Sequence, residues 1–479
     1  MSQTTPQREI SYFLALVPLL SMIGLVWAGL EWKIDLKFVL LVSAVIAGFV
    51  AYISGVKVPE MFEAYGTTIK KAFPAILILM AIGGIVGSWM YSGTVPFLIY
   101  YGLKFLHPDY ILVSAFLVTT MVSTFTGTSW GSAATAGVAF ISIGASMGIP
   151  LPMVAGAALS GAVFGDKVSP ISDTTNLCAL ASEVTVYQHI RGMLPNVIAA
   201  GLISAIGFLI LGMYYSGSGS VGGNIQGVLT DLEGLYNFNL FMLLPAVIVF
   251  VGGYKGFNPV VLMILSSLVA VLIGMLSNGF APSDGANSLI SGFNVSMAIG
   301  NDGGALVSTE LHSLLNRGGF ESMLKGAVLY CILAIGFGAF MHVSGALDKL
   351  MGALLKVVRS AFGLVITAFV AGGLLNATSG NGAFSILTTG QLFAGPFEDK
   401  DLDKAMLARS MENSMTLLES LLPWHVTAVY MYGVFNVKPL DYLPFAFFNI
   451  SGILLFFVFS WRTIYRKRKL KEKQETGMV

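Results

Sequence analysis

Long stretches without a single charged residue dominate the hydrophobic pattern of the chain. The longest runs from Tyr110 to Gly165 and holds no Lys, Arg, Asp or Glu. A helix that crosses a bilayer needs about 20 predominantly apolar residues, so this stretch alone must hold two or three passes. Further uncharged stretches are Ile10 to Leu30, Phe38 to Val56, Ala72 to Leu103, Gly192 to Thr230, Ser360 to Phe397 and Tyr442 to Trp461. The pattern predicts an all-α polytopic membrane protein with about ten to twelve transmembrane helices, two or more of them interrupted.

Composition supports a membrane protein without a soluble domain. Hydrophobic residues make up 55% of the 479 residues and charged residues 11%, whereas soluble domains carry about 25% charged residues. The net charge of +1 is uninformative about nucleic acid, but the chain has no basic domain to bind it, so we expect no nucleic-acid partner. We interpret the first apolar run as a retained helix rather than a signal peptide. Cys178 and Cys331 both lie in apolar surroundings, so we expect buried free thiols, and no metal-ligand motif is present.

Basic residues outside the apolar stretches predict the orientation in the membrane. The segment after Trp461 is rich in Lys and Arg, and Lys57, Lys70 and Lys71 separate the second and third apolar stretches. Cytoplasmic loops carry an excess of Lys and Arg. We therefore predict a multi-pass protein of the cytoplasmic membrane with a cytoplasmic C-terminus, and Arg8 predicts a cytoplasmic N-terminus.

The chain is predicted to contain two related membrane halves. A Gly/Ser-rich segment over residues 216–237 separates a half at 1–215 from a half at 238–461, and a basic tail follows at 462–479. The polar break at Gly127 lies 253 residues before Gly380, and Asp166 lies 253 residues before Glu419. Each acid stands four residues before a proline. Interrupted apolar segments at matching positions of two halves are the best sequence indicator of a transporter's binding site.

The first candidate site element is a hydroxyl-rich break inside the longest uncharged stretch, from Ser123 to Ser132. Irregular backbone at membrane depth occurs only where it is buried in protein or lines a cavity. Its oxygens suit a small hard cation such as Na+, although tight helix packing through small residues is an alternative. Residues 127–131 also match a nucleophile-elbow pattern, but no α/β sheet surrounds them, so we do not expect an enzyme. The candidate binding residues here are Thr126, Gly127, Thr128 and Ser129.

The second element surrounds Pro170 and carries two carboxylates, Asp166 and Asp173. An acidic residue inside the membrane is costly and by default marks a functional path. Competition between Na+ and a proton for one carboxylate would produce exchange. The alternatives are an ion pair between Asp166 and Lys167 and a helix cap at Asp173. The candidate binding residues are Asp166, Ser169, Ser172, Asp173, Thr174, Thr175 and Asn176, with Asp166, Asp173 and Thr128 as the Na+ ligands.

The second half supplies further candidates. Glu412 and Glu419 are seven residues apart, which puts them on nearly the same face of a helix. Arg409 is expected either to pair with an acid or to bind a substrate carboxylate. His425 is expected either to titrate or to serve a structural role. The candidates of this half are Gly380, Asn381, Arg409, Glu412, Asn413, Glu419, Trp424 and His425.

At several of these motifs the sequence resembles the NhaC family of sodium/proton antiporters. The resemblance rests on Gly127–Gly131, Gly161–Leu177, His189–Arg191, Arg317–Gly319 and Pro423–Trp424, and it covers residues from about 10 to 460. It implies two inverted repeats with re-entrant hairpins and discontinuous helices, and Na+/H+ exchange without a cofactor.

The same resemblance leaves a second function open, because the family also contains malate/lactate and amino-acid carriers. This chain has Glu412-Asn-Ser-Met-Thr416 where the family tends to have Glu-Asp-Ser-Gly-Thr, and His425 where it tends to have Asn. The alternative is therefore Na+- or H+-coupled transport of an amino acid or small carboxylate. The expected partners are Na+, protons, the lipid bilayer and a small organic substrate, with a homodimer as an open option.

Overall fold

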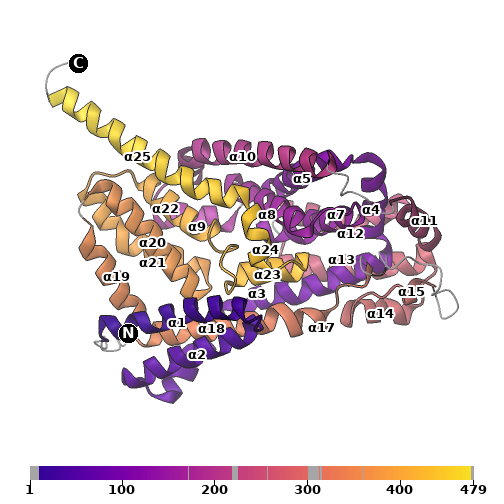
Figure 1. Ribbon diagram of the computed structural model, residues 1–479, viewed down its shortest axis with the longest axis horizontal. Coiled ribbons are helices and arrows are strands. Elements are labelled where there is room, and N and C mark those ends of the chain that lie inside the picture. The colour runs from indigo at the N-terminus through magenta and orange to yellow at the C-terminus, as the bar shows by residue number, and fades with distance from the viewer. Residues whose placement is uncertain are drawn as a thin grey trace.

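The described part of the protein is built from helices. The computed structural model describes residues 10–170, 172–217, 225–255, 257–299, 312, 315–358 and 360–475, and no strand occurs among them (Figure 1). The helices up to residue 217 are α1 (Tyr12–Glu31), α2 (Leu36–Ile53), α3 (Val58–Ser92), α4 (Thr94–Phe105), η1 (Pro108–Tyr110), α5 (Ile111–Thr126), α6 (Ser129–Ser132), η2 (Ala133–Gly137), α7 (Val138–Ser146), α8 (Leu151–Val168), α9 (Asp173–Ala181) and α10 (Val186–Gly217).

The remaining helices begin at residue 225, inside the Gly/Ser-rich segment. They are α11 (Ile225–Leu235), η3 (Leu240–Leu243), α12 (Leu244–Tyr254), α13 (Pro259–Asn278), α14 (Pro282–Ile290), α15 (Ser296–Ile299), α17 (Phe320–Met323), η4 (Leu324–Val328), α18 (Leu329–Val343), α19 (Ala346–Val357), α20 (Ala361–Ser379), α21 (Gly382–Asp399), α22 (Lys404–Thr416), α23 (Val426–Phe435), α24 (Pro439–Tyr442), η5 (Leu443–Phe445) and α25 (Phe447–Glu475). The segment predicted as a linker between the halves thus contains helix α11.

Many of these helices are long and apolar enough to cross a bilayer. Within the described ranges, nine helices meet this requirement, or ten if α11 and α12, bent by 101°, form one broken span. Several carry a stripe of solvent-exposed leucine and isoleucine, as α10 does with Leu202, Ile206 and Ile210. Such a stripe is stable only against lipid or another protein. The prediction of an all-α polytopic membrane protein is confirmed.

Helix boundaries repeat along the chain at the spacing that the motifs predict. Helix α8 begins at Leu151 and α22 at Lys404, and α9 begins at Asp173 and α23 at Val426, so both pairs are 253 residues apart. Helices α5 and α20 end at Thr126 and Ser379, again 253 residues apart. The two halves therefore share an order of helices, breaks and turns over this region.

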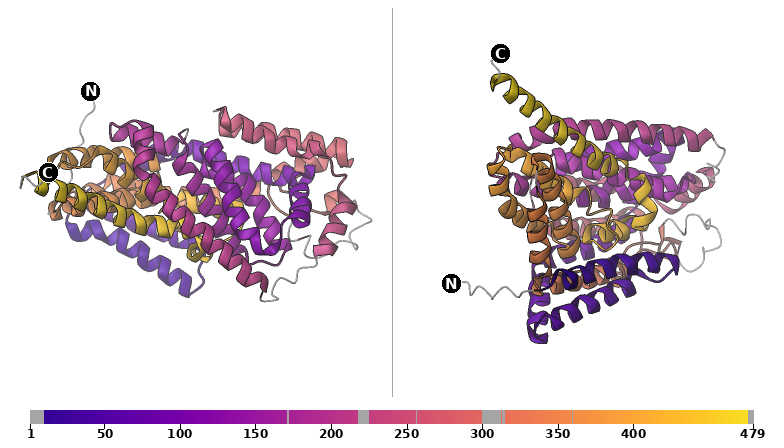
Figure 2. Two further views of the ribbon diagram at one scale, coloured as in Figure 1. Left: turned by 90° about the horizontal axis from the view of Figure 1, so that it is seen from above. Right: turned by 60° about the vertical axis from the view of Figure 1, so that its left-hand side comes forward.

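Two helical hairpins enter the protein from opposite ends of α10. The first hairpin begins with α5, and Asp109, just before α5, lies close to the end of α10. A Cβ added at Gly212 of α10 would be 2.2 Å from the carbonyl oxygen of Asp109. The base of the α20–α21 hairpin lies near the beginning of α10, where Lys404 and Glu183 form an ion pair of 2.6 Å. Asp401, at the same base, pairs with Lys467 of α25 at 3.1 Å. Helix α1 begins and α25 ends on the left in Figure 1, and α25 also ends on the left in the left-hand view of Figure 2.

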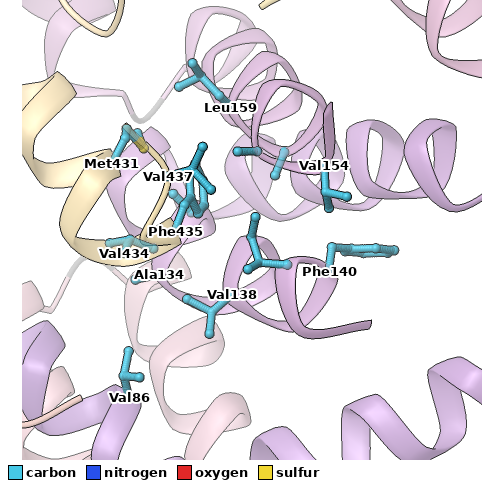
Figure 3. Packing of buried hydrophobic residues seen from close by; sticks show 14 of the residues in the cluster. Val86, Ala134, Val138, Phe140, Val154, Leu159, Met431, Val434, Phe435 and Val437 are labelled. Carbon is cyan, nitrogen blue, oxygen red and sulfur yellow. The ribbon is translucent and has the colours of Figure 1, made fainter. Parts of the chain in front are cut away.

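Helix α23 of the second half packs into the first half. Figure 3 shows Met431, Val434 and Phe435 of α23 facing Ala134 and Val138 in a cluster of buried apolar side chains. Space for this packing depends on a glycine, because a Cβ at position 137 would lie 2.8 Å from the ring of Phe435. Burying this apolar surface joins the two halves into one core, so the helix breaks of both halves are held next to each other.

Candidate functional site

A glycine in the left-handed conformation ends the first helix of each hairpin. Gly127 has φ 66° and its N–H donates to the Ser123 carbonyl at 2.8 Å, and Gly380 has φ 60° and donates to Asn376 at 2.9 Å. A residue with a Cβ adopts this conformation only at a cost, so glycine is the usual helix terminator of this kind. The two breaks predicted from the repeat are therefore built alike.

A polar side chain then begins the next helix in both hairpins. The Thr128 hydroxyl accepts from the backbone N–H of Gly131 at 3.4 Å, and the Asn381 amide oxygen accepts from the N–H of Phe384 at 2.9 Å. These caps satisfy one of the free N–H groups at each helix start. In both motifs, one helix therefore ends at the glycine and the next helix begins at the capping residue, at the tip of a hairpin.

Two longer breaks divide the helices that cross between the hairpins. Helix α8 ends at Val168 and α9 starts at Asp173, while α22 ends at Thr416 and α23 starts only at Val426. The Ser172 hydroxyl caps α9 by accepting from Thr175, and the His425 Nδ1 caps α23 by accepting from Thr427 at 3.1 Å. Glu419 lies inside the longer break, where it is half-buried.

These four breaks border one cavity of about 870 Å³. Its far wall is formed by residues of α3, of α12 and the loop that follows it, and of α13, including Pro74, Lys255 and Met263. The structure brings more than half of the predicted site residues to this cavity. Those that line it are Thr126, Gly127, Thr128, Ser129, Asp166, Asp173, Thr174, Gly380, Asn381, Glu419 and His425.

Three carboxylates lie on the cavity wall at different depths. Asp166 is 6% exposed, Glu419 is half-buried and Asp173 is exposed. One carboxylate oxygen of Asp166, Oδ1, is buried without a hydrogen-bond partner among the described residues. The hydroxyl groups of Ser129 and Ser172 lie next to the same carboxylate. Buried polar atoms are nearly always hydrogen-bonded, so this oxygen is suited to receive a proton or a cation from the cavity.

The neighbouring lysine does not pair with Asp166. The amine of Lys167 donates to the Thr416 hydroxyl at 2.8 Å and lies 3.7 Å from the Glu412 carboxylate, where both charged side chains are fully buried. Glu412 therefore neutralises Lys167 behind the cavity instead of lining it. Helical spacing had placed Glu412 and Glu419 on one face, but α22 ends between them at Thr416.

Other predicted site residues hold the breaks in shape and do not line the cavity. The guanidinium of Arg409 donates to the Gly192 carbonyl at 2.9 Å, and the Trp424 indole donates to the Ala377 carbonyl at 2.9 Å. The remaining members of this group also bond to backbone or lie buried nearby. They are Ser169, which donates to Thr124; Asn176, which donates to Pro170; Asn413, which donates to Arg409; and the buried Ser172 and Thr175.

The cavity also has residues that were not among the predicted binding residues. Trp130 lines it and stacks on Tyr430 with ring centroids 4.2 Å apart. Lys255 reaches it from the loop between α12 and α13, and Thr427 lies beside Glu419. Nothing in the local sequence around Lys255 distinguishes it from an ordinary loop lysine, because only the packing of α12 against the first half brings it to the cavity.

The chain matches a known family along nearly its whole length. The model of the Na+/H+ antiporter family matches residues 6–175 and 161–461. An uncharacterized Na+/H+ antiporter of Haemophilus influenzae is 36% identical over 458 residues, which cover 95% of this chain and 96% of that protein. The Na+/H+ antiporter NhaC of Bacillus subtilis is 32% identical over 79% of this chain and 82% of its own length.

A third relative is named for another activity. The arginine/ornithine antiporter ArcD of Halobacterium salinarum is 32% identical over 488 aligned positions, covering 98% of this chain and 96% of that protein. The resemblance inferred from the motifs is thereby confirmed. On the extent of the family match and of these identities, the chain belongs to the Na+/H+ antiporter family.

Proposed function

We propose that this protein exchanges Na+ for H+ across the cytoplasmic membrane, with Asp166 as the residue that binds the two ions in turn. The observation that carries the proposal is the buried and unpartnered Oδ1 of Asp166 on a cavity bordered by four helix breaks. A carboxylate that binds Na+ cannot hold a proton on the same oxygen at the same time. Competition at one site is sufficient to couple the two fluxes.

Neighbouring side chains offer further oxygens to Na+. Thr128 and Asp173 line the same cavity, and the Ser129 hydroxyl lies next to the Asp166 carboxylate. Hard cations are bound by carboxylate, hydroxyl and carbonyl oxygens. We assign Asp166, Asp173 and Thr128 as Na+ ligands, and the exposed position of Asp173 makes it the first acid that an entering ion meets.

Two inverted repeats would give such a site access to both sides of the membrane. The hairpins at Gly127 and Gly380 enter from opposite ends of α10, and transporters of this architecture move one repeat against the other around a site at the midplane. The excess of Lys and Arg after Trp461 supports a cytoplasmic position for the end of α25.

The test uses purified protein in liposomes that contain a pH-sensitive dye. With the intact protein, an inward Na+ gradient should drive protons out and raise the internal pH. An outward Na+ gradient should draw protons in and lower it. Asp166→Asn should abolish this change, because an amide neither titrates nor supplies a charged ligand. Asp348→Asn, which alters an exposed acid on α19, is the matched control and should leave it intact. Full activity of Asp166→Asn would refute the assignment.

A second candidate function is the exchange of a cationic amino acid. Cavities that hold small organic ligands measure about 300–1,000 Å³, and this one, at about 870 Å³, is far larger than a single Na+ requires. Its wall carries three carboxylates but, among the described residues, one lysine, Lys255. This charge balance favours a positively charged solute over malate or lactate. Counterflow of labelled arginine in the same liposomes, without Na+-driven pH change, would favour this candidate over Na+/H+ exchange.

A further inference from the structure

Three metal-binding side chains meet behind the cavity. Cys178 of α9, His189 of α10 and Glu412 of α22 bring a sulfur, a ring nitrogen and a carboxylate oxygen within 4.8 Å of one another. All three side chains are fully buried, and none of them lines the cavity described above. The cluster is invisible in the sequence, because 223 residues separate His189 from Glu412 and the motif has no regular spacing.

The polar atoms of this cluster are poorly satisfied by the protein itself. Both ring nitrogens of His189 and both carboxylate oxygens of Glu412 are buried without a hydrogen-bond partner among the described residues. The Nε2 of His189 lies 3.7 Å from Oε2 of Glu412, too far for a hydrogen bond. Because buried polar atoms seldom remain unpaired, the arrangement indicates a ligand that supplies the missing partner.

The chemistry of the three donors selects the kind of ligand. Thiolate sulfur and imidazole nitrogen bind borderline ions such as Zn²⁺, Co²⁺ and Cd²⁺, whereas Na+ and Mg²⁺ prefer oxygen alone. A divalent ion with a thiolate, a carboxylate and a neutral imidazole forms a group of zero net charge. The Lys167 ammonium lies beside this group, so the ion together with its immediate surroundings carries one net positive charge.

The nearby lysine is compatible with an ion in this place. The Lys167 amine lies 3.7 Å from Oε1 of Glu412, whereas His189 faces the other oxygen, Oε2. Glu412 can therefore bind an ion through Oε2 while Oε1 still faces the amine. A ligating carboxylate normally has such an outer partner, which fixes its orientation. The hydrogen bond from Lys167 to Thr416 holds the amine on this side.

We propose that Cys178, His189 and Glu412 form a binding site for one divalent ion of the zinc type. Binding replaces the thiol proton of Cys178, which is released as H+, and joins α9 and α10 of the first half to α22 of the second. An ion in this place would cross-link the halves whose relative movement transport requires, so micromolar Zn²⁺ or Cd²⁺ should inhibit transport.

The site is tested by Co²⁺ binding to the purified full-length protein in detergent, which requires no transport. Co²⁺ should produce a thiolate-to-metal absorption band and the visible bands of a tetrahedral ion, and Zn²⁺ should displace it. Cys178→Ser should weaken the affinity by at least about 100-fold, since even the loss of an outer-shell partner costs about 10–100-fold. Cys331→Ser changes the other buried free cysteine and should bind as the wild type does.

Two results would overturn the proposal. One is a folded wild-type protein, judged by its elution as a single species, that gives no thiolate band with Co²⁺. The other is an unchanged band in Cys178→Ser. Because the readout is spectroscopic, a failure here leaves the assignment of Asp166 untouched, and a failure of Na+/H+ exchange leaves this site standing.

Discussion

The buried pair of Lys167 and Glu412 offers a quantitative test of how the two halves are held together. Lys167 belongs to α8 and Glu412 to α22, and both side chains are at most 1% exposed with 3.7 Å between the charged atoms. We consider Lys167→Met and Glu412→Gln, singly and together. Each single change leaves one charge buried without its partner, whereas the double change removes both.

The expected change in the free energy of unfolding follows from the distance between the two charges and from their burial. At 3.7 Å and an effective dielectric constant of about 20, the attraction between the two charges is about 4 kcal/mol. Removing one partner of a buried ion pair costs about 3–5 kcal/mol, because the remaining charge is uncompensated, while replacing both partners is often close to neutral. The double variant should therefore recover most of the stability lost by either single variant. The coupling energy, which is the loss of the double variant minus the losses of the two single variants, should then be about −6 to −10 kcal/mol.

The assay is the free energy of unfolding in mixed micelles of denaturing and non-denaturing detergent, measured for the four proteins of the cycle. Thr416→Val is the control that removes the hydrogen-bond acceptor of Lys167 but keeps the charge pair; it should cost about 1 kcal/mol. If the losses of the two single variants simply add in the double variant, the two charges do not interact, and the attribution of stability to this pair is wrong.

Four further variants test local features of the fold. Gly161→Ala should destabilise the protein by at least about 2 kcal/mol, since its Cβ would lie 2.1 Å from a carbonyl oxygen of α5; Gly352→Ala, with open space around it, should instead stabilise α19 by up to about 1 kcal/mol, and equal unfolding energies for the two would contradict the packing argument. Gly380→Ala should cost about 1–3 kcal/mol because of its positive φ, and should lower the transport rate by displacing the hairpin tip; an unchanged transport rate would count against a role for this tip. The hydrogen bond and charge of Lys404 lower the pKa of Glu183, so Lys404→Met should return this pKa toward its ordinary value. The stability that the pair adds is present above that ordinary pKa and is lost on acidification. Because the pair is exposed, the substitution should hardly change the thermal midpoint at neutral pH.

Much of the architecture could be predicted from the sequence. Uncharged stretches predicted ten to twelve spans, and the described residues hold nine, or ten with the broken pair. The spacing of 253 residues located both pairs of helix breaks, including the glycines at 127 and 380. These features are local, because an apolar run of sufficient length must be helical in a bilayer and a left-handed turn requires glycine. The family could be inferred for the same reason, since its motifs are short and continuous.

The partners of individual side chains could not be predicted in this way. Asp166 and Lys167 are adjacent in the sequence, yet one faces the cavity and the other faces Glu412 behind it. Glu412 and Glu419 were expected on one helix face, but the end of α22 between them sends one acid to the buried lysine and the other to the cavity wall. Arg409, a candidate ligand for a substrate carboxylate, bonds to the backbone of α10.

The sequence by itself determined that this is an all-α membrane protein of two related halves with polar breaks at fixed positions. Only the tertiary structure decided which acids share a cavity, which acid neutralises Lys167, and that Cys178 and His189 lie beside Glu412. The physical reason is that helix formation and helix breaking depend on residues within a few positions of each other. Charge compensation and ligand geometry instead depend on contacts between α8, α9, α10 and α22, which the packing of the two halves alone creates.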